Sequence, residues 1–152
     1  MDKTEFIGRY RERIRVRLDW YALGGEEWTV RTVRLALPQD LPKLWTPWYA
    51  NAASGPPPSD PQAWPLSVEH AAANRARLGA NQNTLDRHMA EWREDQIIEA
   101  PALALARERF LLLDRNHHVV AGALLLRPAT LMLHALVGPP GAKMLLDLPR
   151  LE

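Results

Sequence analysis

Five consecutive polar residues form the part of this sequence best suited to chemistry. They are Asp114, Arg115, Asn116, His117 and His118. A carboxylate such as that of Asp114 can hold Mg²⁺ or orient a histidine, and the imidazole of His117 can exchange a proton near neutral pH. These two residues are the catalytic candidates. The other three, together with His117, are the candidates for binding a phosphate group.

The residues around this stretch predict that it lies at a corner between a strand and a helix. Phe110 to Leu113 is a short continuous apolar run, as in a strand buried on both faces. From His118 onward the apolar residues follow helical spacing until Pro128. The polar stretch would then occupy a helix N-terminus, where N–H groups outside the helical ladder and the positive end of the helix dipole favour anions.

Simpler interpretations exist for each of these residues. Asp114 or Asn116 would cap the following helix, and we prefer capping to catalysis for both. A zinc site built from Asp114, His117, His118 and His134 is disfavoured, because adjacent histidines diverge on a regular backbone. We expect His134 to be a hydrogen-bonded core histidine, and we expect no metal site. His88, on a predicted helix, has only a small chance of entering a site.

An N-terminal β-hairpin is predicted over residues 1–37. Arginines occupy every second position from Arg9 to Arg17, which places them on one face of a strand. Gly24-Gly25 is a turn signal, and pairing across it would set Arg15 opposite Arg34. We prefer to interpret this ribbon as a solvated edge balanced by glutamates. The alternative is a face that binds nucleic acid, formed by Arg11, Arg13, Arg15, Arg17 and Arg34.

Residues 38–65 are rich in proline and predict a long irregular connection, which makes them a candidate lid or partner surface. Aromatic residues would pin this loop to the body of the domain, because they are costly to leave in water. These residues are Trp45, Trp48, Tyr49 and Trp64.

Two helices and two further strands are expected in residues 66–137, followed by a tail over 138–152. The first helix would run from a Ser67 cap to Leu78, with Gly79 as its stop, and Asn83 or Thr84 would cap the second. Leu85, Met89 and Trp92 share one face of that second helix and should lie in the core. Residues 97–105 predict a bent strand in which Pro101 marks an edge or a bulge, and residues 130–137 predict a covered strand.

Composition limits the possible functions. The 152 residues suffice for one domain with its own core, so residues 1–152 are expected to form a single domain. The absence of cysteine excludes thiol chemistry and cysteine-ligated metals. A net charge of +1 gives the chain no general attraction to nucleic acid or acidic membranes. No apolar run has the length of a membrane span or a signal peptide, so we expect a cytoplasmic protein without a membrane partner.

The order of these features resembles the ParB/sulfiredoxin-like domain over roughly residues 28–137. In that family a helix and a strand of the type Pro-Ile-x-Val precede a short strand that leads into a signature such as GERR, GCHR or DGxHR. The matching residues here are Asp114 to His118. The resemblance implies an α+β fold with a small mixed sheet and helices, and a corner that binds phosphate. Relatives bind CTP or ATP, so the implied ligand is a nucleotide, with Mg²⁺ as the candidate cofactor.

This sequence also departs from the family signature. Arg115 occupies the glycine slot, and His118 occupies the final arginine slot without arginine's permanent charge. Asn116 occupies the cysteine slot of sulfiredoxins, which excludes their reaction. Two function classes follow: a nucleotide- or phosphate-binding domain with weak hydrolase or phosphotransfer activity, or a non-catalytic module that binds DNA or a protein. The sequence leaves the substrate, the oligomeric state and the choice between an enzyme and a binding protein open.

Overall fold

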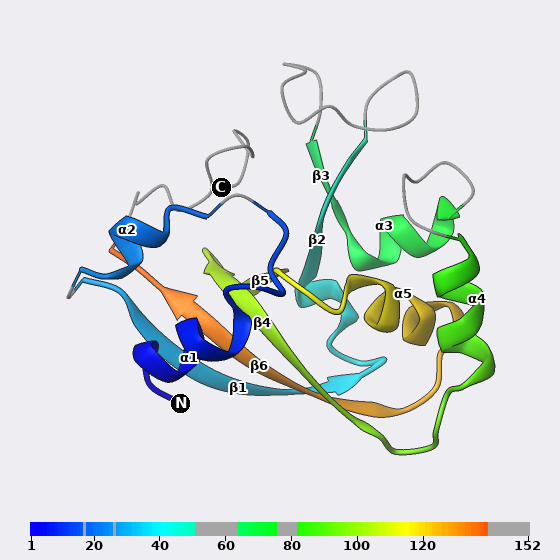
Figure 1. Ribbon diagram of the computed structural model, residues 1–152. Coiled ribbons are helices and arrows are strands. Elements are labelled where there is room, and N and C mark those ends of the chain that lie inside the picture. The colour runs from blue at the N-terminus through cyan, green and yellow to red at the C-terminus, as the bar shows by residue number, and fades with distance from the viewer. Residues whose placement is uncertain (17, 26, 51–63, 76–81, 140–152) are drawn as a thin grey trace.

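A six-stranded mixed sheet with helices forms the molecule, as the computed structural model shows (Figure 1). The structure describes residues 1–16, 18–25, 27–50, 64–75 and 82–139. The sheet order is β1-β6-β4-β5-β2-β3. Its strands are β1 (Thr29–Leu37), β2 (Leu44–Ala50), β3 (Trp64–Ser67), β4 (Ile97–Leu105), β5 (Arg109–Leu112) and β6 (Ala129–Val137). The helices are α1 (Lys3–Tyr10), α2 (Trp20–Leu23), the 3₁₀ helix η1 (Leu41–Lys43), α3 (Val68–Ala73), α4 (Gln82–Ala90) and α5 (Asn116–Leu125). The predicted α+β class with a mixed sheet is confirmed.

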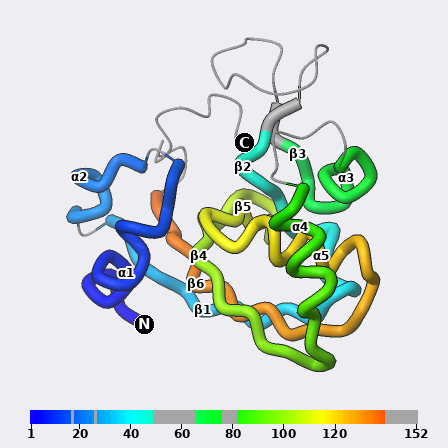
Figure 2. The backbone as a smooth tube through the Cα atoms, turned by 45° about the vertical axis from the view of Figure 1, so that its right-hand side comes forward, coloured from blue at the N-terminus to red at the C-terminus, as the bar shows by residue number. Residues whose placement is uncertain are grey.

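Both faces of the sheet are covered, which explains the continuous apolar runs of its central strands. One core joins the strands to α3, α4 and α5, and the other joins them to α1, α2 and the segment between these two helices (Figures 1 and 2). In β5, Phe110 and Leu112 belong to the first core and Leu111 to the second. This alternation follows from the two-residue period of a strand.

The centre of the sheet agrees with expectation except at Pro101. β6 lies between β1 and β4, and it is largely buried. β4 is also an interior strand, and its registers with β5 and β6 run without a shift, so the prediction that Pro101 marks an edge or a bulge is wrong. The Pro101 carbonyl accepts the Leu113 N–H at 2.9 Å, beyond the last β4–β5 pair, Ala102 with Leu112. The amide and the carbonyl of a strand residue point to the same neighbouring strand, so the missing N–H of Pro101 would have pointed toward β5. β5 has already ended at this level, and the hydrogen bonds between β4 and β6 are therefore not interrupted by the proline.

The predicted N-terminal β-hairpin is wrong. Residues 3–10 form α1, whose N-cap Asp2 accepts the Glu5 N–H at 2.8 Å, and Phe6 and Tyr10 are buried one helical turn apart. β1 pairs with β6 instead, so that Arg34 stands opposite Met132 and not opposite Arg15. The free energy gained by burying Phe6 and Tyr10 on one face of the helix stabilises α1, although the spacing of the arginines favours a strand. The predicted position of Arg17 lies outside the described residues.

The predicted loop over residues 38–65 is partly wrong, because it contains β2 and the start of β3. β2 runs parallel to β5, with Leu44 opposite Phe110, and antiparallel to β3. Trp45 and Trp48 pack against the two cores, which confirms that they anchor this region. The side chains of Tyr49 and Trp64, and residues 51–63 entirely, lie outside the described part of the chain.

The helices of the second half differ from prediction mainly at their ends. Ser67 caps α3 as expected by accepting the His70 N–H at 3.1 Å, but α3 ends at Ala73; Leu78 and Gly79 lie outside the described residues. α4 begins at Gln82, so Asn83 and Thr84 lie within it and do not cap it. Among the helices described, none is long and apolar enough to cross a bilayer. The 138–152 tail is described only to residue 139.

Candidate functional site

The polar stretch lies at a strand-to-helix corner, as predicted. β5 ends at Leu112, and the first hydrogen bond of the α5 ladder joins the Val119 N–H to the Arg115 carbonyl at 3.0 Å. Arg115 is the N-cap, with φ 66° and ψ 19°, and no side chain caps the helix. The preferred interpretation that Asp114 or Asn116 provides the cap is therefore wrong. Arg115 adopts the left-handed conformation that glycine would adopt readily in the same slot.

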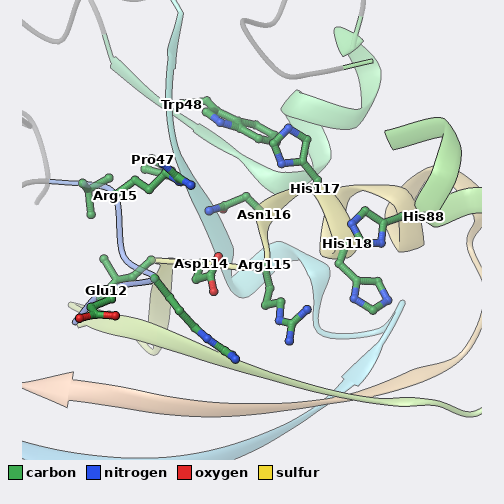
Figure 3. Close-up of a pocket in the computed structure, with 13 residues that line it drawn as sticks. Glu12, Arg15, Pro47, Trp48, His88, Asp114, Arg115, Asn116, His117 and His118 are labelled. Atoms are coloured by element: carbon green, nitrogen blue, oxygen red, sulfur yellow. The ribbon is translucent and has the colours of Figure 1, made fainter. Parts of the chain in front are cut away.

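A cavity of about 710 Å³ opens at this corner, and it includes all five predicted site residues (Figure 3). Figure 3 shows Glu12 and Arg15 on one side of the hollow and His88, His117 and His118 on the other. The volume lies within the range of small-molecule sites. The lining residues are Glu12, Arg13, Arg15, Val16, Pro47, Trp48, His88, Leu113, Asp114, Arg115, Asn116, His117 and His118.

Asn116 is the buried polar residue of this cavity. It is 9% exposed, and its Nδ2 lies 3.5 Å from the Leu112 carbonyl, at the limit of a hydrogen bond. Its Oδ1 accepts no hydrogen bond within the described part of the protein. A buried acceptor without a donor is costly, and a ligand that supplies a donor would relieve this cost.

Three arginines border the cavity and form no ion pair with any residue that the structure describes. Arg13 and Arg15 reach it from the segment after α1, and Arg115 comes from the corner itself. Within the described ranges, the ion pairs of the protein involve other arginines, such as Arg9 with Glu99 at 2.6 Å. Guanidinium groups that gather without carboxylate partners favour a bound anion.

Of the arginines predicted to form a nucleic-acid face, the four that the structure describes do not share one strand surface. Arg11 stacks over Trp20 at 5.7 Å, and Arg34 lies on β1, away from the cavity lining. Arg13 and Arg15 point to a hollow rather than along a strand, because residues 11–16 form no strand with β1. The prediction that these arginines lie on one face of a β-hairpin is therefore wrong.

The histidines around the cavity are held in the neutral form. The ring of His117 packs edge-on against Trp48 at 5.0 Å, and burial lowers its pKa, with the charges of His88 and Arg87 adding to the effect. Burial also lowers the pKa of His88. A neutral imidazole can accept a proton, so His117 fits the role of general base predicted from the sequence.

Ring contacts and one hydrogen-bond partner, rather than an ion pair, fix the position of the His118 side chain. Its ring stacks on His88 at 4.7 Å, meets the edge of Trp92 at 5.6 Å, and its Nε2 lies 2.9 Å from Gln96 Oε1. Burial lowers the pKa of His118 to about 4. It therefore does not supply the positive charge that an arginine would bring to the same slot.

The four-residue zinc set is not brought together. His134 does not line the cavity; it is buried in the sheet, with Nδ1 3.3 Å from Thr32 Oγ1 and Nε2 3.5 Å from Glu99 Oε1. This agrees with the expected core histidine. In the part of the chain that the structure describes, no three histidine or acidic side chains are placed to share a metal ion.

Several site residues were missed or undervalued from sequence. Arg13 and Arg15 were assigned to a different surface, Trp48 was placed in a loop that was expected to be a lid or a partner surface, and His88 was given little weight. No local signal joins them to the corner, since each comes from another element. Comparisons with models of protein families, with curated proteins and with solved structures gave no match.

Proposed function

We propose that the corner cavity binds a phosphate-bearing small molecule, and that a nucleotide is the class of ligand it takes. The observation that carries this proposal is the position of the cavity at the N-terminus of α5. There, among the described residues, three arginines lack ion pairs and the Oδ1 of the buried Asn116 accepts no hydrogen bond. The resemblance to ParB/sulfiredoxin-like domains names the nucleotide class. The proposal keeps the cytoplasmic location expected from the sequence.

Phosphate would lie against the first turn of α5. The helix is ten residues long, and its first-turn N–H groups precede the ladder that starts at Val119. Such groups and the helix dipole attract phosphate oxygens, and Arg115 adds a permanent charge beside them. The positive charge that His118 lacks is supplied instead by Arg115 and by Arg13 and Arg15 across the cavity.

The Oδ1 of Asn116, which accepts no hydrogen bond from the described residues, favours a ligand that carries a hydroxyl or amino group as well as phosphate. The ionised oxygens of a phosphate ester are acceptors and cannot donate to this atom. A ribose hydroxyl or the amino group of a base would donate to it. This requirement favours a nucleotide over a ligand that offers ionised phosphate oxygens alone.

Weak hydrolysis or phosphotransfer is the activity that the same residues would support. Asp114 would hold Mg²⁺ together with phosphate oxygens, which is the usual way that proteins bind this ion. His117, neutral near pH 7 because its pKa is lowered, would accept a proton from an attacking water or hydroxyl group. The nucleotide would bind first, and hydrolysis or phosphotransfer would follow as a second step.

Calorimetric titration of the full chain with ATP and with CTP, with and without Mg²⁺, tests the binding step. Asn116→Ala removes the buried amide, and we expect it to weaken binding by roughly tenfold, as the loss of one hydrogen bond in a buried site would. Asn83→Ala, the same substitution at an exposed position of α4, should leave the affinity unchanged. Release of phosphate from the bound nucleotide, reduced in His117→Ala, tests the second step.

Two results would count against the proposal. Heats of mixing that show no saturable binding of either nucleotide would remove it altogether. Equal weakening by Asn116→Ala and Asn83→Ala would mean that the ligand binds elsewhere on the protein.

A further inference from the structure

The segment of residues 12–16 meets the corner although it lies far away in the sequence. It supplies Glu12, Arg13, Arg15 and Val16 to the cavity wall, opposite the first turn of α5 (Figure 3). This segment also lies outside residues 28–137, over which the chain resembles a known family. Its part in the cavity is therefore a feature of this chain itself.

Packing of the alternate residues fixes this segment in place. The N–H groups of Arg13 and Ile14 both donate to the Tyr10 carbonyl, at 2.9 and 3.0 Å, and Ile14 is buried in the core that also contains Tyr10. The backbone is thus fixed before and after the exposed Arg13, by the hydrogen bonds to Tyr10 and by the burial of Ile14. Arg15 is the residue directly after Ile14. The two arginines extend from a fixed support, which reduces the entropy lost when they bind an anion.

The charges around the cavity are unbalanced. The lining contains three guanidinium groups and two carboxylates, those of Glu12 and Asp114, and its histidines have lowered pKa values that favour the neutral form. Arg13, Arg15 and Arg115 line the same hollow, and like charges that face one cavity repel one another unless an anion lies among them.

We propose that Arg13 and Arg15 form a second anion subsite, so that the cavity selects ligands with two or more linked phosphate groups. This inference rests on the proposed function: the first phosphate binds at the α5 N-terminus, and the next one meets the two arginines across the hollow. A cavity of about 710 Å³ has room for considerably more than one phosphate group. The two arginines are then specificity-determining residues that no part of the corner motif contains.

Affinities of the full chain for orthophosphate, pyrophosphate and tripolyphosphate, obtained from thermal shifts over a range of ligand concentrations at one ionic strength, test this subsite. We expect pyrophosphate and tripolyphosphate to bind the natural chain roughly tenfold or more tightly than orthophosphate, because arginine and phosphate form charge-assisted hydrogen bonds. Arg13→Gln with Arg15→Gln should remove most of this preference and change orthophosphate binding much less.

The matched control is Arg34→Gln with Arg107→Gln, which removes the same charge at two exposed positions that do not line the cavity. It should keep the preference for linked phosphates. If the Arg13 and Arg15 variant keeps that preference, or if both double variants lose it equally, the second subsite is wrong while phosphate binding at the corner stands. If the natural chain binds none of the three anions, the corner site fails as well.

Discussion

His118 illustrates how a polar side chain beside a cavity can serve packing rather than charge. Its imidazole stacks on the ring of His88, meets Trp92 in a T-shaped contact and lies next to Gln96. The positive neighbours Arg115 and Arg93 oppose its protonation in addition to burial. The residue therefore contributes packing between α4 and α5, and the cationic part of the site comes from elsewhere.

The lowered pKa of His118 predicts a loss of stability in mild acid. Its pKa is about 4 in the folded protein and about 6.5 in an unfolded chain, so the unfolded chain takes up a proton first as the pH falls. The free energy of unfolding should decrease from about pH 6.5 down to about pH 4. His118→Phe keeps a ring in the stack without a titrating group, and denaturant unfolding across this range should show a shallower decrease.

His70→Phe serves as the control, because His70 is exposed and its ring lies outside the cavity. It should leave the pH dependence as it is in the natural chain. His88 and His117 have pKa values lowered in the same direction, so part of the decrease should persist in the His118 variant. An identical pH profile for the natural chain and His118→Phe would contradict this account of the stacked histidines.

At the scale of elements, α5 is positioned by close contact with Trp92, two residues after the end of α4. Gly122 faces Trp92, and a Cβ at position 122 would lie 2.6 Å from Trp92 Cη2. Since Trp92 also meets the edge of His118, this contact sets the distance between the two helices at the cavity. Glycine is needed here for close approach and not for an unusual backbone angle.

Gly122→Ala should therefore destabilise the protein by about 1–3 kcal/mol, the usual cost of overpacking a core. Gly8→Ala is the matched control: a Cβ on Gly8 in α1 would meet nothing within 4 Å. That substitution should stabilise the protein by about 0.5–1 kcal/mol through helix propensity. Urea unfolding measures both, and equal effects at the two glycines would contradict the role given to Trp92.

Elements with local signals were predictable, whereas elements defined by distant partners were not. β5, the corner, α5 and β6 follow from short apolar runs and periodicity within about thirty residues of sequence, which is where pattern arguments are strongest. The N-terminal hairpin was wrongly predicted because the alternate arginines from Arg9 to Arg17 favour a strand, whereas the helix α1 depends on the burial of Phe6 and Tyr10 in the core. β2 was missed because Pro47 and the prolines around the strand suggest a loop, and its pairing with β5 depends on residues far along the chain.

At the scale of the molecule, the candidate site is assembled from separate parts of the chain. The segment of residues 12–16 joins the end of β2, α4 and the β5–α5 corner around one hollow. The corner alone was visible in the sequence, because its five polar residues are contiguous. The charged wall opposite was not, because it depends on the core that α1 and Ile14 form on the other face of the sheet.

The most direct test of the central claim follows backbone amide signals in two-dimensional proton–nitrogen NMR spectra of the full chain during titration with ATP. The account predicts that the amides of Asn116, His117 and His118 show the largest shifts and that these shifts saturate together. Signals from the exposed β1 residues Arg31 and Arg34 should barely move. Unchanged amides at the start of α5, or largest shifts on β1, would contradict a phosphate site at this corner.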